Sequence, residues 1–326
     1  MRALITGVAG FAGGHLAAYL AAQPGIKVVG CGQQTAAPAF LAATIEYHEI
    51  DLRDSDAVTD LLTAVQPDQI YHLAAQAFVP ASWADPWDTL ETNIKMQLNL
   101  LRAMQQVGLT KARLLAVTSN EVYGKVGAAD GTPVDEQHVF QPKNPYAVSK
   151  VTQDLLAGLY AELGLGVVIA RPFNHIGARQ APGFVVPAFA AQVARIEAGL
   201  QPPVIEVGNL DALRDFSDVR DVVRAYHLLV ERGTPGEAYN IGSGVLRPIR
   251  AVLEGLLALS DVRVEVRVDP ARLRPVDPPG LCADTRKLRV ATGWLPRYSF
   301  DETLAEVLND QRARVAEQLN MGRMTM

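Results

Sequence analysis

A tyrosine and a lysine four residues apart are the clearest chemical signal in the chain. Of the nine tyrosines, only Tyr146 has a lysine at the fourth position after it, Lys150. Asn144 is a good helix N-cap and Pro145 suits the first helical position, so the sequence predicts a helix that begins here and carries both side chains on one face. Because an ammonium group favours a nearby phenolate, we expect a lowered pKa for Tyr146 and a proton donor or acceptor working near neutral pH.

The predicted helix also has an apolar face, formed by Val148, Val151, Leu155 and Leu159. We expect this face to pack against a sheet while the Tyr–Lys face looks into a cleft. Taken alone, the Tyr–Lys spacing fits a pair on a surface helix better than a site. Whether the pair forms a functional site therefore depends on the elements that would position it.

A glycine-rich turn near the N-terminus is the second signal. A short apolar run, Arg2 to Thr6, predicts a strand, and helical spacing resumes at Leu16 and Leu20. Between them the glycines follow the spacing G-x-x-G-x-x-G, which permits a tight turn and lets the backbone approach a pyrophosphate at the helix N-terminus. The sequence predicts a dinucleotide site with contacts from Gly7, Gly10, Phe11, Ala12 and Gly13.

Further cofactor contacts are expected at the ends of the following strands. The second predicted strand, 27–31, ends without the acidic residue that binds an adenine-ribose hydroxyl, which favours NADP(H), with NAD(H) as the alternative. After the third strand, 45–49, Asp51 is placed to contact the adenine amino group, with capping of the next helix as the alternative role. The remaining predicted contacts are Leu52 beside Asp51, residues at the ends of the strands 69–73 and 166–171 (Leu73, Ala74, Ala75 and Arg171), and Lys150 on the predicted helix.

Three polar side chains follow the strand predicted at 113–118 and therefore lie at the carboxyl edge of the predicted sheet. They are Ser119, Asn120 and Glu121. In open α/β sheets, ligands bind outside the carboxyl ends of the strands, so these side chains fall where a substrate would lie. By contrast, Asn93 has the character of a helix-packing residue.

Composition excludes several classes of protein. Lysine and arginine number 30 against 35 acidic residues, with no basic run, so we expect no nucleic acid partner. Two cysteines and no Cys/His cluster of zinc-ligand spacing predict no metal. No stretch reaches the roughly 18 apolar residues of a membrane span, so we expect a cytoplasmic protein without a membrane partner.

The predicted fold class is α/β, a doubly wound and mainly parallel Rossmann sheet with a smaller α/β substrate-binding lobe on the C-terminal side. We assign the Rossmann domain to residues 1–172, with 216–243 returning to it, and the lobe to residues 173–215 and 244–326.

Together, the glycine loop, Ser119 and the Tyr146/Lys150 pair resemble the extended short-chain dehydrogenase/reductase family over nearly the whole chain. The segments 72–75 and 214–219 look like further family segments. The resemblance implies that Ser119 faces Tyr146 across a cleft. It also implies a nucleotide-linked sugar as substrate and a homodimer through the helices at 86–106 and 146–163.

Within that family the chain looks most like reductases of GDP-linked 4-keto-6-deoxy-hexoses. The segments that carry this resemblance are 171–177, 183–185, 207–209 with 214–216, and 273–275. The turn Ala178-Arg179-Gln180 departs from the family pattern. The resemblance implies a GDP-sugar partner held by Asn120, Asn174, Val185, Arg214 and Arg274. For the last two, a surface ion pair is the alternative role.

The implied reaction is NAD(P)H-dependent reduction of a 4-keto sugar to GDP-6-deoxy-D-mannose (GDP-D-rhamnose). In it Tyr146 protonates the developing alkoxide, Lys150 lowers the phenol pKa and Ser119 donates a hydrogen bond. A GDP-mannose 4,6-dehydratase, with Glu121 as catalytic base, and a nucleotide-sugar 4-epimerase stay open as alternatives. A dinucleotide-sensing regulatory protein is the alternative outside enzymes.

Overall fold

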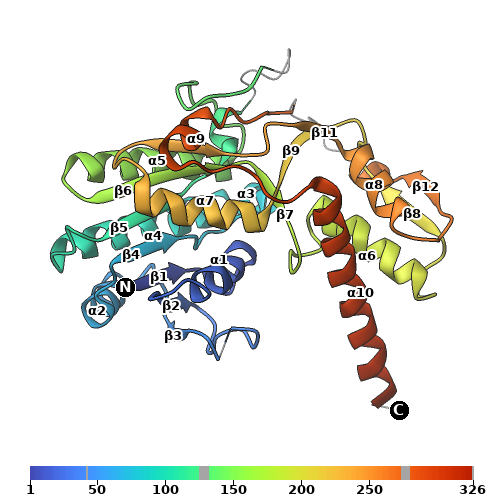
Figure 1. Cartoon of the computed structure of the whole chain (residues 1–326), viewed down its shortest axis with the longest axis horizontal. Helices are drawn as coiled ribbons and strands as arrows, with labels where there is room; N and C mark the ends of the chain where they lie inside the picture. The colour runs from blue at the N-terminus through green and yellow to red at the C-terminus, as the bar shows by residue number, and fades with distance from the viewer. Residues whose placement is uncertain (42, 125–131, 273–279, 325–326) are drawn as a thin grey trace.

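The computed structural model describes residues 1–41, 43–124, 132–272 and 280–324. Its main sheet has seven strands in the order β10-β6-β5-β4-β1-β2-β3, and each neighbouring pair is parallel (Figure 1). The strands are β1 (Arg2–Thr6), β2 (Lys27–Gly32), β3 (Glu46–Glu49), β4 (Gln69–His72), β5 (Arg113–Val117), β6 (Gly166–Pro172) and β10 (Ala238–Ile241).

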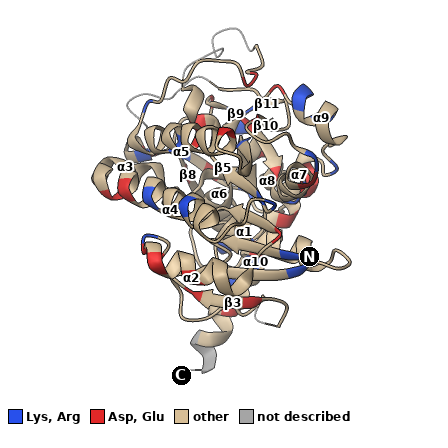
Figure 2. Cartoon of the chain, turned by 90° about the vertical axis from the view of Figure 1, so that its left-hand side faces the viewer, with Lys and Arg blue, Asp and Glu red and all other residues tan. Residues whose placement is uncertain are grey.

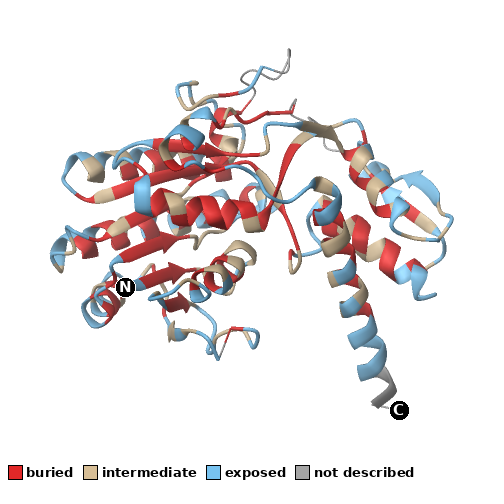
Figure 3. Cartoon of the chain, in the orientation of Figure 1, coloured by how far each residue is buried: buried red, intermediate tan, exposed pale blue. Residues whose placement is uncertain are grey.

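Helices cover both faces of this sheet. The first face carries α1 (Phe11–Ala21), α7 (Val219–Arg232) and the short α9 (Arg286–Thr292), and the second carries α2 (Ser55–Val65), α4 (Pro86–Gln106) and α5 (Pro145–Glu162). Leu4 and Ile5 are neighbours in β1, both fully buried, and they belong to the cores on opposite faces. Figure 3 shows the central strands almost wholly buried. The predicted doubly wound α/β fold is confirmed.

The smaller lobe has its own core and two small sheets. One has the order β11-β9-β7, and in the other β12 pairs with β8. Their strands are β7 (Asn174–Ile176), β8 (Val204–Val207), β9 (Leu213–Asp218), β11 (Leu246–Pro248) and β12 (Glu265–Val268). The helices of the lobe are α6 (Val185–Glu197), α8 (Ile249–Ala258) and α10 (Phe300–Met324). The remaining short elements are α3 (Val79–Ala84), η1 (Asn120–Tyr123) and η2 (Pro270–Arg272).

The chain passes between the two parts several times. Strand β9 of the lobe runs straight into α7 on the main sheet, and β10 pairs with β6 at the sheet's edge. The domain boundaries inferred from the sequence remain a proposal, which these crossings support.

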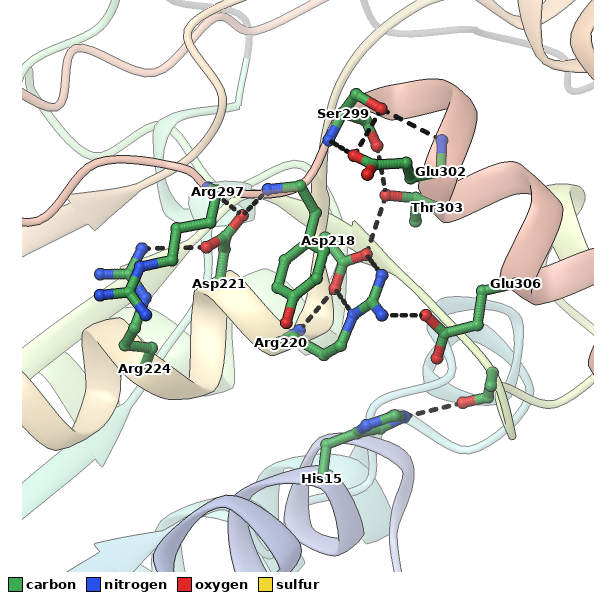
Figure 4. A network of polar contacts seen from close by, with 12 residues as sticks. His15, Asp218, Arg220, Asp221, Arg224, Arg297, Ser299, Glu302, Thr303 and Glu306 are labelled. Carbon is green, nitrogen blue, oxygen red and sulfur yellow. Dashed lines mark hydrogen bonds and ion pairs between the residues drawn. The ribbon is translucent and has the colours of Figure 1, made fainter. Parts of the chain in front are cut away.

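A polar network ties α7 to the lobe (Figure 4). Asp218 caps α7 and accepts hydrogen bonds from Thr303 of α10 at 2.8 Å and from the Arg220 guanidinium, which also pairs with Glu306 of α10. Asp221 accepts the backbone N–H of Arg297 at 2.8 Å. Because α7 lies on the main sheet, these contacts fix the position of the lobe relative to the carboxyl edge of that sheet, where the cofactor contacts are predicted.

One packing prediction for α5 is wrong. Val148, Leu155 and Leu159 are 42%, 61% and 50% exposed, and only Val151 of the predicted apolar face packs against a buried cluster. The face turned to the sheet carries polar side chains instead, among them Lys150 and Asp154. Hydrophobic spacing alone could not reveal this, because the polar contacts that hold α5 come from distant parts of the chain.

None of the helices in the described ranges is long and apolar enough to cross a membrane. Within the same ranges, no group of three or more His, Cys, Asp or Glu side chains is arranged to hold a metal ion.

Candidate active site

The start of α5 places the predicted Tyr–Lys pair at the carboxyl edge of the sheet. Asn144 caps the helix, its Oδ1 accepting the N–H of Ala147 at 2.7 Å, and Pro145 is the first helical residue. Tyr146 and Lys150 are 8% and 4% exposed. The pair is therefore a buried feature and not a pair on a surface helix.

Ser119 faces Tyr146, as the resemblance implied. It ends the stretch after β5, and its hydroxyl is close enough to the Tyr146 phenol to lower the pKa of the phenol. The same hydroxyl accepts the N–H of Glu121 at 3.2 Å, which begins the short helix η1. Asn120 lies beside Ser119, its Oδ1 3.5 Å from the serine hydroxyl. Two elements distant in sequence thus bring Ser119, Asn120, Glu121 and Tyr146 together.

The predicted lowering of the Tyr146 pKa is wrong for this structure. Burial raises the pKa of Tyr146; the nearby Ser119 hydroxyl opposes this rise, and the charge of Glu121 adds to it. Lys150 does not reach the phenol: its Nζ lies 5.8 Å from the centre of the Tyr146 ring and donates to the carbonyl of Val117 at 3.0 Å. Burial also lowers the pKa of Lys150 to about 7, which weakens the charge that the sequence argument relied on.

Asn93, which the sequence did not single out as a site residue, locks the start of α5 in place. It is fully buried in α4, and its Nδ2 donates to Ser149 Oγ at 2.9 Å and to the carbonyl of Gln76 at 3.0 Å. Its Oδ1 accepts the N–H of Gln76 at 2.8 Å. Ser149 in turn donates to the carbonyl of Tyr146 at 2.7 Å. Asn93 therefore joins the segment after β4 to the backbone of the catalytic tyrosine candidate.

Arg171, predicted as a cofactor contact, forms a buried ion pair with Asp154, which lies one helical turn after Lys150 in α5. Its Nε and Nη2 donate to the two oxygens of Asp154 at 2.8 and 2.7 Å, and its Nη1 reaches the hydroxyl of Tyr123 at 2.9 Å. Asp154 also accepts from Thr118 at 3.2 Å. These bonds fasten α5 to β5 and β6, and the cofactor role of Arg171 stays a prediction.

The glycine loop fits a dinucleotide pyrophosphate. Gly7 has φ +69°, and a Cβ there would lie 2.9 Å from the backbone of Ala74. A Cβ on Gly13 would lie 2.2 Å from the carbonyl of Gly7, so the turn closes only with glycine. No side chain caps α1 at Gly10, which leaves the first-turn amides of Phe11, Ala12 and Gly13 able to bind a phosphate.

Asp51 lies at the expected strand end and is held by an arginine that the sequence argument missed. The Arg53 side chain donates to both of its oxygens, among others from Nε to Oδ1 at 3.0 Å and from Nη2 to Oδ2 at 2.6 Å, and the Arg53 backbone N–H donates to Oδ1 at 2.9 Å. This contact lowers the pKa of Asp51 to about 2. Capping of α2 belongs to Asp54 and not to Asp51. Leu52 beside it is buried.

The end of β4 lies directly against the glycine loop. The N–H of Ala74 donates to Thr6 Oγ1 at 3.2 Å, and this hydroxyl lies 2.9 Å from Nδ1 of the buried His72. Leu73, Ala74 and Ala75 are partly exposed here. The predicted cofactor residues of β1, α1 and β4 therefore form one continuous edge.

Apart from Asn120, the predicted substrate contacts among the described residues come from the lobe. Asn174 begins β7 and Arg214 lies in β9, both half-buried, while Val185 is the first residue of α6. Arg274 lies outside the described residues. The turn that departs from the family pattern packs on α1 and on the loop after β2: Ala178 O accepts from His15 at 2.8 Å, and the Arg179 guanidinium lies 4.2 Å from the centre of the Phe40 ring.

Comparisons with known proteins agree with this geometry. Residues 4–307 match the family described as GDP-mannose 4,6 dehydratase. A GDP-6-deoxy-D-mannose reductase from Pseudomonas aeruginosa is 38% identical over 97% of this chain and 99% of its own length. A GDP-mannose 4,6-dehydratase from Vibrio cholerae is 30% identical over 94% of this chain and 92% of its own.

Solved structures give the same result. RMD from Pseudomonas aeruginosa complexed with NADPH superimposes with a TM-score of 0.85 at 36% identity, covering 96% of this chain and 99% of that one. The resemblance predicted from the sequence is confirmed. Because the family match spans nearly the whole chain, the protein belongs to the GDP-mannose 4,6-dehydratase family.

Proposed function

We propose that this protein reduces the 4-keto group of a GDP-linked 4-keto-6-deoxy-hexose to GDP-6-deoxy-D-mannose, with NADP(H) as the favoured cofactor. The observation that carries the proposal is the placement of Ser119 beside the buried Tyr146 phenol, at the sheet edge that also carries a glycine loop built for a dinucleotide. The identity of 38% to a GDP-6-deoxy-D-mannose reductase and the NADPH held by RMD support the choice of substrate and cofactor. The cytoplasmic location predicted from the sequence stays part of this proposal.

The side chains divide the chemistry among them. The amides after Gly10 and the Lys150 side chain would hold the reduced dinucleotide, which would supply the hydride when bound. Ser119 donates a hydrogen bond to the substrate's C4 oxygen as negative charge develops there, and Tyr146 delivers the proton. A raised pKa suits this direction, because the phenol keeps its proton at neutral pH until an alkoxide takes it.

The dehydratase named in the family match is the second candidate. Glu121, the base that dehydration would need, forms a hydrogen bond with Asn144 at 3.1 Å and acts electrostatically on Tyr146. The neighbouring Asn120 weighs against this reaction, because an amide is a poor donor of the proton that a departing hydroxyl needs.

A pair of incubations decides between them. With GDP-4-keto-6-deoxymannose and NADPH or NADH, a reductase consumes one reduced nicotinamide per product. With GDP-mannose and catalytic NADP, a dehydratase accumulates a 4-keto product without net cofactor use. Accumulation of that product by the wild type would overturn the reductase proposal.

We also infer a homodimer formed through α4 and α5. Its support is the exposed apolar row of Val148, Leu155 and Leu159 on α5, a helix that packs beside α3 and α4 (Figure 2). Charged residues are few on α5 itself: Lys150, Asp154 and Glu162. Light scattering should give twice the chain mass for the wild type and the monomer mass for Leu155→Glu/Leu159→Glu. A monomeric wild type would contradict the inference.

A further inference from the structure

The loop after β2 carries no charged residue, although the adenosine ribose of the cofactor is expected there. Residues 33–41 contain neither a basic nor an acidic side chain. In a dinucleotide-binding sheet this position separates the two cofactors, because a carboxylate binds the 2′-hydroxyl of NAD and a nearby arginine accommodates the 2′-phosphate of NADP. An arginine that serves this purpose therefore has to come from another part of the chain.

The fold places Arg179, in the turn between β7 and α6, on this loop. Its guanidinium lies 4.2 Å from the centre of the Phe40 ring. The ring in turn lies against the start of α1, because a Cβ added to Gly14 would come within 2.8 Å of it. The neighbouring Ala178 accepts a hydrogen bond from His15 of the same helix at 2.8 Å. Arg179 therefore lies where the loop after β2 meets α1, the helix whose first-turn amides are expected to bind the pyrophosphate.

The charge of Arg179 is half-buried and is not neutralised by an ion pair. Two acidic residues of α10 act on it electrostatically, but each is bonded to another arginine. Glu306 is bonded to Arg220 (Figure 4), and Asp310 is bonded to Arg314 at 3.0 Å. Burial lowers the pKa of Arg179 more than the two carboxylates raise it. A guanidinium partly removed from water, and with no carboxylate among the described residues at ion-pair distance, is arranged to receive an anion.

The arginine that follows β3 differs in this respect. Arg53 donates from Nε and Nη2 to the two carboxylate oxygens of Asp51 at 3.0 and 2.6 Å. These bonds neutralise its charge. Of the two arginines, Arg179 is therefore the one available to a further anion.

The backbone of Arg179 is in a conformation that favours glycine. Its φ is +68°, in the left-handed region. Such strain persists where the surrounding structure holds it, and it is concentrated at ligand-binding sites. A glycine would adopt the same backbone without strain but would offer no cation. The side chain of Arg179 is therefore the feature that needs a function.

We propose that Arg179 binds the 2′-phosphate of NADP(H) and thereby sets the preference of the protein for this cofactor over NAD(H). This inference rests on the proposed function for the choice of cofactor. A guanidinium offers parallel N–H donors to two oxygens of one phosphate, and stacking on Phe40 keeps the group oriented. Because Arg179 follows β7 of the lobe, the cofactor preference depends on how the lobe packs on the main sheet and not on the residues that follow β2.

Calorimetric titration with NADPH and with NADH, in the absence of sugar, tests the assignment. Loss of the charge-assisted bonds in Arg179→Gln should weaken NADPH binding by roughly 10- to 100-fold and leave NADH binding nearly unchanged. Arg179→Lys should keep part of the preference. The matched control is Arg250→Gln, since Arg250 is an exposed arginine of the lobe that pairs with Asp211 at 2.9 Å. It should bind both cofactors as the wild type does.

Arg179→Gly separates a binding role from a structural one. Because glycine adopts this φ without strain, the melting temperature of the cofactor-free variant should stay unchanged or rise, while NADPH affinity falls as in Arg179→Gln. Equal weakening of NADPH and NADH binding would mean that Arg179 only supports the shape of the site, and would overturn the assignment. A preference for NADPH that survives in Arg179→Gln and Arg179→Gly would also overturn it.

Failure of the proposed function gives a different result. A wild type that binds NADH as tightly as NADPH would overturn both the assignment of Arg179 and the choice of NADP(H) as the favoured cofactor. Reduction of the 4-keto sugar is decided separately, by product formation, since the titrations contain no sugar.

Discussion

The Asn144 side chain holds Glu121 with the same amide group that caps the catalytic helix. Its Oδ1 accepts the N–H of Ala147 at 2.7 Å, and its Nδ2 donates to Glu121 Oε2 at 3.1 Å. The carboxylate that a dehydratase would use as its base is therefore positioned by the residue that starts the helix carrying Tyr146. This contact gives Glu121 a structural role that does not depend on proton abstraction.

Glu121→Gln separates the two reactions, because glutamine still offers an oxygen to Asn144 but cannot act as a base. For a reductase, we expect the variant to keep a large part of its kcat on a 4-keto substrate. If the wild type instead forms product from GDP-mannose and Glu121→Gln does not, the protein is a dehydratase. Glu121→Ala is the control: it removes the oxygen as well, and should impair a reductase more than Glu121→Gln does.

Tyr146→Phe should lower turnover by roughly 100-fold or more, because the proton donor is gone while the ring still fills its buried place. NADPH binding, followed by fluorescence, should persist. The control is Tyr123→Phe, the same chemical change at a buried tyrosine whose hydroxyl donates to Asn240 and accepts from Arg171. It should cost stability but keep the activity of the folded fraction. Near-normal turnover in Tyr146→Phe would remove Tyr146 from proton transfer.

Asn93→Ala should lower both stability and kcat, with little change in KM. It leaves the polar groups of Gln76 and Ser149 without their partner, a loss of about 1–3 kcal/mol in the free energy of unfolding. Asn99→Ala is the matched control, since Asn99 is a buried asparagine of the same helix that bonds the carbonyl of Leu52. Urea denaturation should show a loss in both, but kcat should fall only in Asn93→Ala. A normal kcat there would show that Asn93 is merely a packing residue.

The buried Lys150 should make the stability of the cofactor-free protein depend on pH in a specific way. Burial lowers its pKa from 10.5 to about 7, so between these values the unfolded chain binds a proton that the folded chain does not. The free energy of unfolding should therefore rise with pH across this window, by roughly 1.4 kcal/mol per pH unit from this group. Below pH 7 its unfavourable contribution is greatest.

The measurement compares urea denaturation of wild type and Lys150→Met between pH 6 and pH 10. The difference in stability, wild type minus variant, should be flat below about pH 7 and should rise above it. A difference that stays constant up to pH 10 would mean that Lys150 keeps its proton in the folded protein, and that its pKa is not lowered.

Features encoded by neighbouring residues could be predicted from the sequence. Strand, glycine turn and helix follow one another within the first 21 residues, and the structure places β1 and α1 there. The capping pair Asn144-Pro145 set the start of α5 correctly, and the helix expected at 86–106 agrees with α4, Pro86–Gln106. Local backbone preference and side-chain period are sufficient for such features, because each depends on residues within a few positions.

Contacts between distant residues were decided only by the tertiary structure. Asn93 meets Ser149 across 56 positions and Arg179 packs on Phe40 of the loop after β2, and neither partner is marked in the other's local sequence. The same holds for electrostatics: the sequence placed Lys150 near Tyr146, but only the packed protein shows that burial raises the phenol pKa and lowers the pKa of the lysine. Sequence spacing determined which residues lie at the site. Burial, which depends on everything that packs around them, determined their protonation and their partners.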